Sequence, residues 1–148
     1  MKAAIVYYSK HHGNTKRVLD AIAGKYPVEL INVIDQPDAE LEGYELIGIA
    51  SGIYAGSFAK PLLKYLKKYL PVKSRVFFIS TSAGPKPDYE KSVRKLCIGK
   101  ECDVLGGYMC LGFNTFGPTK LFGGTAKGHP TREELDDAVS FYEDIMNK

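Results

Sequence analysis

Seven residues near the N-terminus have the types and the spacing of a phosphate-binding loop. They are Ser9-Lys10-His11-His12-Gly13-Asn14-Thr15, between an apolar run, Ala3–Tyr8, and a helical pattern that begins at Thr15. The first N–H groups of a helix have no acceptor within the helix and lie at the positive end of its dipole, so they bind phosphate well. Gly13 has no Cβ to obstruct a ligand, and Ser9 and Thr15 carry hydroxyl donors. The stretch predicts a phosphate site, with an ordinary strand-to-helix turn as the alternative.

The spacing of residues in this loop argues against two common classes of phosphate site. The chain has no G-x-x-x-x-G-K-[ST] sequence, which argues against a nucleoside triphosphatase. It has no G-x-G-x-x-G after its first apolar run, which argues against a dinucleotide site there. A monophosphate suits one short loop. Lys10 is its only certain cation, since the two histidines are mostly neutral at pH 7, so backbone amides must provide most of the positive charge.

Apolar runs that recur at regular intervals indicate the strands that must position this loop. Most are continuously apolar, as expected of strands buried on both faces of a parallel sheet. The five runs are Ala3–Tyr8, Val28–Ile34, Leu46–Ala50, Val76–Ser80 and Val104–Leu111. Helical patterns alternate with them over Thr15–Lys25, Asp38–Gly43, Phe58–Leu70, Asp88–Ile98 and Thr131–Met146, the last opened by the capping box Thr131-Arg132-Glu133-Glu134. This order predicts one α/β domain, residues 1–148, with a doubly wound five-stranded parallel sheet and helices on both faces.

Two further loops follow strands of this predicted sheet. Ligands of such sheets bind beyond the carboxyl ends of the strands. One loop is Ser51-Gly52-Ile53-Tyr54-Ala55-Gly56-Ser57-Phe58, and the other is Ser80-Thr81-Ser82-Ala83-Gly84-Pro85-Lys86-Pro87-Asp88-Tyr89. Small residues let the amides of both loops approach a ligand, and Tyr54, Phe58 or Tyr89 offers a ring to stack on it. Beside a phosphate loop, these features suit a flat heteroaromatic cofactor with a phosphorylated tail.

On these residues the chain resembles the flavodoxin family over essentially its whole length. Tyr8-Ser9 and Gly13-Asn14-Thr15 resemble the family's S/T-x-T-G-N-T phosphate loop. The run from Ser51 to Gly56 resembles the loop beside the flavin ring, and the run from Ser80 to Gly84 resembles the loop at its pyrimidine edge. The resemblance implies the strand order 2-1-3-4-5, FMN as the cofactor, and electron transfer through the flavin.

The resemblance also implies which residues bind the cofactor. The first loop would bind the 5′-phosphate, Tyr54-Ala55-Gly56 would lie along the isoalloxazine, and Ser82-Ala83-Gly84 would offer amides to its O2 and N3 edge. Gly56 is the candidate for a backbone flip beside N5, because glycine tolerates both peptide orientations. The expected set is Ser9, Lys10, His11, His12, Gly13, Asn14, Thr15, Ser51, Gly52, Ile53, Tyr54, Ala55, Gly56, Thr81, Ser82, Ala83, Gly84 and Tyr89. No catalytic residue and no metal ligand is predicted.

The chain departs from the family pattern in three ways. The phosphate loop has one more residue before Gly13, with His11 and His12 where the family often has Thr. One alternative is that both histidines face the solvent. The other is that His12 donates to the phosphate and binds it more tightly when protonated. The chain has no Trp, and its net charge is +3 where electron-carrying flavodoxins are usually acidic. Lys60, Lys64, Lys67 and Lys68 form a stripe on the third helical pattern, which is either a solvated face or a surface that steers an acidic partner or a phosphorylated nicotinamide.

Two functions fit these features. The first is an FMN-binding electron carrier that serves redox partner proteins. The alternative is an NAD(P)H-dependent FMN or quinone reductase, because the irregular, Gly-rich segment Gly112–Pro130 would form a substrate wall, unless it is a structural insertion. A phospho-acceptor domain of the same topology is set aside, since it needs acidic residues where Tyr8-Ser9 and Ala50-Ser51 stand.

Composition and charge indicate which partners and which cellular compartment to expect. The mild net charge does not argue for nucleic acid, and no apolar run approaches the roughly 20 residues of a membrane span. The N-terminus enters a strand without the pattern of a secretory signal. Three cysteines without C-x-x-C spacing favour a reducing cytoplasm over a disulfide framework. We therefore expect a cytoplasmic protein that is a monomer or a weak homodimer.

Overall fold

The computed structural model describes the chain except for residues 10–12, 85 and 112–128. Five parallel strands form its sheet, in the order β2-β1-β3-β5-β6. They are β1 (Ala3–Tyr8), β2 (Glu29–Asn32), β3 (Leu46–Tyr54), β5 (Arg75–Ser82) and β6 (Asp103–Leu111). This confirms the order 2-1-3-4-5 expected for the parallel strands. A sixth strand of two residues, β4 (Ser57–Phe58), pairs antiparallel with the end of β3 and was not predicted.

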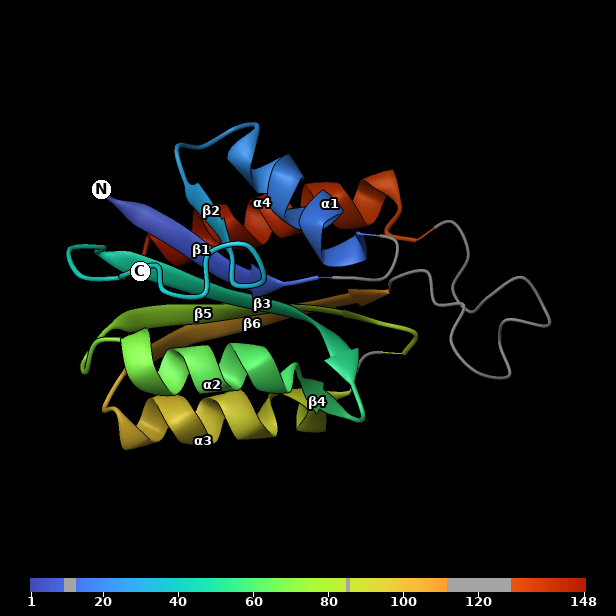
Figure 1. Ribbon diagram of the computed structural model, residues 1–148. Coiled ribbons are helices and arrows are strands. Elements are labelled where there is room, and N and C mark those ends of the chain that lie inside the picture. Colours follow the sequence, from blue (N-terminus) through green and yellow to red (C-terminus); the bar gives the residue numbers. More distant parts are fainter. Residues whose placement is uncertain (10–12, 85, 112–128) are drawn as a thin grey trace.

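Helices cover both faces of this sheet, as predicted. Figure 1 shows α1 (Asn14–Ala23) and α4 (Arg132–Met146) on one face, and α2 (Lys60–Tyr69) and α3 (Lys91–Gly99) on the other. A short 3₁₀ helix, η1 (Pro87–Glu90), leads into α3. Among the described residues, no helix is long and apolar enough to cross a membrane.

Successive residues of the central strands alternate between two hydrophobic cores. The core beneath α2 and α3 takes Ala4, Val6, Ile47, Ile49, Val76 and Phe78 from the strands. The core beneath α1 and α4 takes Ala3, Ile5, Leu46, Ala50, Phe77 and Ile79. Because side chains of a strand point alternately to its two faces, both faces must be apolar, and this is why these strands are continuous apolar runs.

The structure corrects several predicted helix boundaries. The six-residue pattern Asp38–Gly43 forms turns and not a helix, because so short a pattern lacks the length to offset the cost of helix nucleation. Phe58 belongs to β4, so the third predicted helix begins at Lys60. The predicted helix Asp88–Ile98 divides into η1 and α3.

The capping box predicted at the last helix is present in the structure. The Glu134 N–H donates to the Thr131 hydroxyl (3.2 Å), and the Thr131 N–H donates to the Glu134 carboxylate (2.9 Å). Two backbone N–H groups at the start of α4 are thereby satisfied by the reciprocal pair.

Candidate functional site

The carboxyl ends of three central strands lie side by side at one edge of the sheet. The parallel register aligns Tyr8 of β1 with Ser51 of β3, and Ser51 with Ser80 of β5. In Figure 1 these strands end at the right-hand edge, where α1 also begins. The register therefore brings together the segments that the sequence predicted to converge. Lys10, His11 and His12 lie outside the described residues.

The helix that follows the predicted phosphate loop begins at a left-handed glycine. Gly13 is the N-cap of α1 with φ +61°, and no atom of the described residues lies within 4 Å of the position that a Cβ would take. The Arg17 N–H donates to the Gly13 carbonyl (2.9 Å), which starts the helical ladder. In the part of the chain that the structure describes, no side chain caps this helix, and its first turn has no acidic residue. An anion placed here would meet the positive end of the helix dipole without a competing carboxylate.

A buried hydrogen bond joins the start of this helix to the end of β5. The hydroxyls of Thr15 and Thr81 are 2.9 Å apart, and the two residues are 1% and 4% exposed. These residues come from the first and the third predicted loops. Their contact fixes the helix N-terminus against the sheet, so Thr15 has a positioning role whether or not it also contacts a ligand.

The second predicted loop is mostly strand, which corrects the expectation from sequence. Ser51, Gly52, Ile53 and Tyr54 extend β3, and only Ala55-Gly56 forms the turn into β4. The φ angles of these two residues are +50° and +78°. Two central residues with positive φ characterise the type I′ turn, whose twist matches that of the flanking strands. The hairpin therefore presents the backbone of Ala55-Gly56 at a defined place beside the strand ends.

The hydroxyl of Ser51 is bonded within the protein. It is buried, accepts the Ala59 N–H (3.0 Å) and donates to the Gly52 carbonyl (2.5 Å). Ala59 is the N-cap of α2, so Ser51 ties β3 to the start of that helix. The side chain thus shapes the hairpin base, a role that the sequence did not indicate.

Aromatic rings stand at the ends of β1 and β3. The rings of Tyr8 and Tyr54 meet edge to face, with centroids 5.5 Å apart and planes at 85°. Both residues are half-buried, as are Tyr89 in η1 and the Ser82-Ala83-Gly84 run. Ser82 ends β5, so the third predicted loop begins later than expected. Sequence reasoning included Tyr8 only as part of the phosphate motif and missed its contact with Tyr54, because only the sheet register shows it.

Sequence reasoning also missed the role of Glu134 at the base of α4. Besides the Thr131 N–H, its carboxylate accepts the Leu111 N–H (3.0 Å) and contacts the His129 ring. Partial burial acts to raise the pKa of this carboxyl, but the hydrogen bonds from Thr131, His129 and Leu111 outweigh it and lower the pKa. In the sequence, the capping box was the only sign that Glu134 has a structural role, and it did not predict the hydrogen bond from Leu111 at the end of β6.

In the described part of the chain, the fold and this sheet edge define a doubly wound α/β protein in which a helix N-terminus without a side-chain cap lies near aromatic rings. The chain belongs to the flavodoxin family, since the family model of the flavodoxin domain matches residues 5–104. An uncharacterized protein of Methanocaldococcus jannaschii is 35% identical over 148 residues, which is 99% of each chain.

Solved structures show the same fold. A flavodoxin from the domain Archaea superposes with a TM-score of 0.70 at 18% identity, over 99% of both chains. A Fusobacterium nucleatum flavodoxin variant bound to flavin mononucleotide gives a TM-score of 0.69 at 16% identity, over 99% of this chain and 96% of that one.

Proposed function

We propose that this protein binds FMN and acts as an electron carrier. The observation that carries the proposal is the convergence at one sheet edge of the α1 N-terminus, the Ala55-Gly56 turn and the end of β5. Membership in the flavodoxin family and the FMN-bound flavodoxin with the same fold support the cofactor.

The described residues fit each part of FMN. The N–H groups that follow Gly13 would hold the phosphate, because the glycine leaves the cradle open and no acidic side chain opposes an anion in the first turn of α1. The Ala55-Gly56 turn and the Tyr54 ring would lie along the isoalloxazine, and Ser82-Ala83-Gly84 would meet its polar edge. Among the described residues, no atom lies within 4 Å of a Cβ placed on Gly56, so this peptide has room to reorient beside the ring.

Bound FMN supplies reversible electron transfer, and the chain controls its surroundings. The half-buried Tyr8 and Tyr54 rings would exclude water from one side of the flavin. The buried Thr15–Thr81 bond would hold the phosphate cradle in place relative to the ring-binding segments. A site held by rigid elements favours electron transfer because little of the protein must reorganise.

The alternative is an NAD(P)H-dependent FMN or quinone reductase. The observation that favours it is that β6, which precedes the Gly112–Pro130 segment, ends with Leu111 at the same sheet edge as the candidate site; residues 112–128 lie outside the described residues. The electron donor is then NAD(P)H in place of a redox partner protein. The two functions share the cofactor and differ in how electrons enter.

Absorbance spectroscopy tests both proposals. We expect the protein to take up FMN in a one-to-one complex, and stepwise anaerobic reduction to resolve two one-electron steps. A single two-electron step, with steady NAD(P)H oxidation in the presence of a quinone, would replace the carrier by the reductase. If FMN is not taken up at all, the proposed cofactor is wrong and the family fold remains.

A further inference from the structure

A hollow of about 530 Å³ lies where the end of β1, the segment after β2 and helix α2 meet. Its size falls within the range of about 300–1,000 Å³ that is usual for small-molecule sites. Three tyrosines, Tyr8, Tyr65 and Tyr69, line it together with Lys64, Lys68 and Asp38. The candidate FMN site shares Tyr8 with this hollow and uses none of the other residues that line it.

The aromatic part of the wall is held in place. Tyr65 and Tyr69 stack with ring centroids 4.9 Å apart and planes at 29°. The Tyr65 hydroxyl donates to the Ala39 carbonyl (2.5 Å), and the Tyr69 hydroxyl donates to the Asp38 carboxylate (3.0 Å). Tyr65 is buried behind the half-buried Tyr69 ring, so Tyr69 would provide most of the aromatic surface that a planar ligand meets. Because both rings are tethered at their hydroxyl ends, this surface is preformed, and binding would cost little side-chain entropy.

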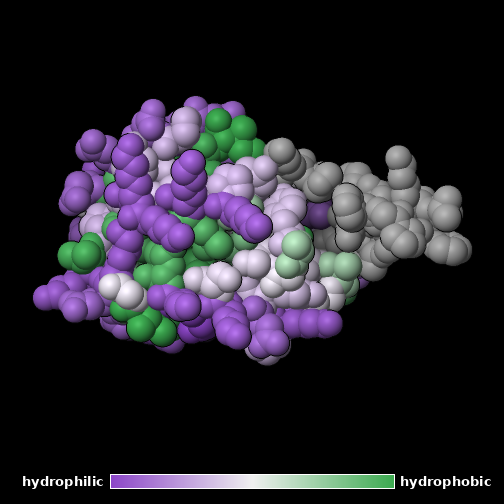
Figure 2. Space-filling model, turned by 60° about the horizontal axis from the view of Figure 1, so that its bottom comes forward, coloured by the Kyte–Doolittle hydropathy of each residue, from purple (hydrophilic) through white to green (hydrophobic). Residues whose placement is uncertain are grey.

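The charged part of the wall is positive. Lys64 and Lys68 are one helical turn apart and line the same hollow. Neither belongs to any ion pair among the described residues, and the Lys68 ammonium lies 5.2 Å from the centre of the Tyr69 ring. The one carboxylate among the described residues of the wall, on Asp38, accepts the Tyr69 hydroxyl. On the face that Figure 2 turns forward, long hydrophilic side chains gather around hydrophobic ones.

We propose that this hollow binds a planar aromatic anion of about mononucleotide size. Its ring would lie against the tyrosine wall, and its negative group would lie between the Lys64 and Lys68 ammonium groups, where two cations face one carboxylate. Tyr8 lines the hollow and also contacts Tyr54 of the candidate FMN site. The ligand would therefore be a neighbour of the cofactor and not a competitor for its place.

Calorimetric titration of the protein with and without one equivalent of FMN tests this site. The probes are adenosine 5′-monophosphate and 2-naphthoate as aromatic anions, with adenosine as the uncharged ring and ribose 5-phosphate as the ring-free anion. We expect at least one aromatic anion to bind, and adenosine and ribose 5-phosphate to bind at least tenfold more weakly. Binding of adenosine 5′-monophosphate alone assigns the site to nucleotides, and comparable binding of 2-naphthoate assigns it to aromatic anions in general.

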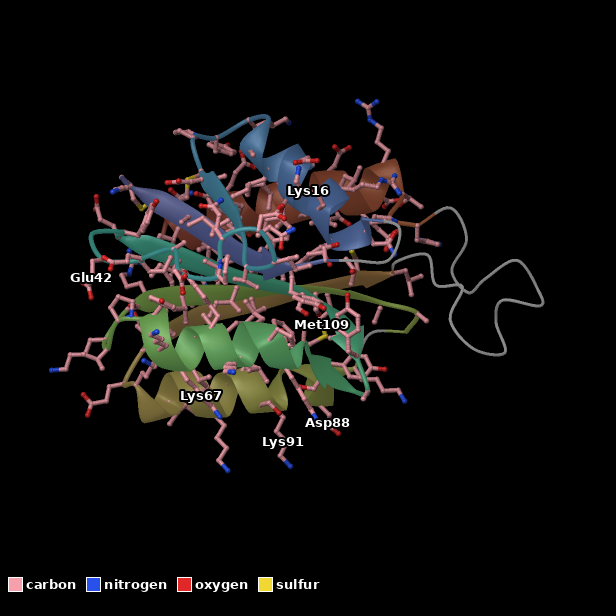
Figure 3. All side chains as sticks on the ribbon, in the orientation of Figure 1. Lys16, Glu42, Lys67, Asp88, Lys91 and Met109 are labelled. Atoms are coloured by element: carbon pink, nitrogen blue, oxygen red, sulfur yellow. The ribbon has the colours of Figure 1, made fainter. Side chains whose placement is uncertain are left out.

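The variant Lys64→Gln/Lys68→Gln should weaken the aromatic anion at least tenfold. Lys67→Gln is the control, because Lys67 lies on the same helix (Figure 3) and is not one of the residues that line the hollow. It should change affinity less than twofold. No binding at millimolar probe, equal affinity in both variants, or displacement of the probe by one equivalent of FMN would each overturn the proposal. FMN uptake is measured separately, so failure of this site does not bear on the proposed cofactor.

Discussion

Among the described residues of the candidate phosphate cradle, Gly13 alone has a positive φ, at +61°. We predict that Gly13→Val weakens FMN binding at least tenfold, because the new side chain fills the open cradle and disfavours the left-handed conformation. The strain costs roughly 1–2 kcal/mol of folding free energy. Fluorescence titration of FMN measures the affinity, and urea unfolding measures the stability.

Gly43→Val is the matched control for this prediction. Gly43 also has a positive φ (+88°) and no described atom within 4 Å of the position that a Cβ would take, but it lies in a turn before β3, away from the strand ends. We expect a similar loss of stability and unchanged FMN affinity. Equal FMN affinity in both variants would remove Gly13 from the site.

Glu134 makes the free energy of unfolding depend on pH over the range in which its carboxyl becomes protonated. Its pKa is lowered in the folded protein, so its contribution is present above the unfolded pKa, which is near 4.5, and is lost as pH falls through the folded pKa. We predict that Glu134→Gln destabilises the protein by about 1–2 kcal/mol at pH 7, where charge-assisted hydrogen bonds are lost. Below about pH 4 the difference from the unsubstituted protein should shrink.

Glu133→Gln provides the control for Glu134, since Glu133 is an exposed residue in the same first turn of α4. Its effect on the free energy of unfolding should stay within about 0.5 kcal/mol. Urea unfolding at several pH values gives both comparisons. If Glu134→Gln lowered the free energy of unfolding by the same amount at every pH, the charge of the Glu134 carboxylate would not contribute to the stabilising hydrogen bonds.

Packing between β1, β3 and β5 depends on one glycine in the middle of the sheet. A Cβ on Gly48 would lie 2.4 Å from Cζ of Phe77 and 2.8 Å from Cγ1 of Ile5, and both neighbours are fully buried. The Phe77 ring thus occupies the space that a side chain of β3 would fill. We predict that Gly48→Ala destabilises the fold by about 1–3 kcal/mol through overpacking.

Gly99→Ala tests whether the cost at Gly48 comes from crowding. Gly99 ends α3, and no described atom lies within 4 Å of a Cβ placed there. Alanine has the higher helix propensity, so the change should be neutral or stabilising by less than about 1 kcal/mol. Comparable losses in the two variants, measured by urea unfolding, would argue against the Phe77 contact as the cause.

The whole molecule should gain stability from FMN, because the proposed site joins the N-terminus of α1, the β3–β4 hairpin and the end of β5. FMN at 100 times its dissociation constant stabilises the folded state by about 2.7 kcal/mol. For a chain of this length, the midpoint of thermal unfolding should rise by roughly 5–10 °C. Riboflavin at the same concentration should give a smaller shift, since it has no phosphate for the cradle. Equal shifts would mean that the phosphate does not contribute.

The sequence by itself determined the fold class. Continuous apolar runs separated by helical patterns require a parallel sheet covered on both faces, and the alternation of Ile5 and Val6 between the two cores bears this out. The strand order came with the family resemblance of the loops after those runs. The capping box at Thr131 and Glu134 was equally local, because each partner lies within one helical turn of the other. Local patterns of this kind survive in almost any tertiary context.

Only the tertiary structure decided which residues meet at the candidate site. The Tyr8–Tyr54 and Thr15–Thr81 contacts join residues 46 and 66 positions apart, and they depend on strand register, which no local pattern encodes. The β3–β4 hairpin could not be predicted, because small residues after a strand occur both in irregular loops and in tight turns. The tyrosine-lined hollow beside α2 could not be predicted either, because it depends on the turns before β3, which bring Asp38 to Tyr69.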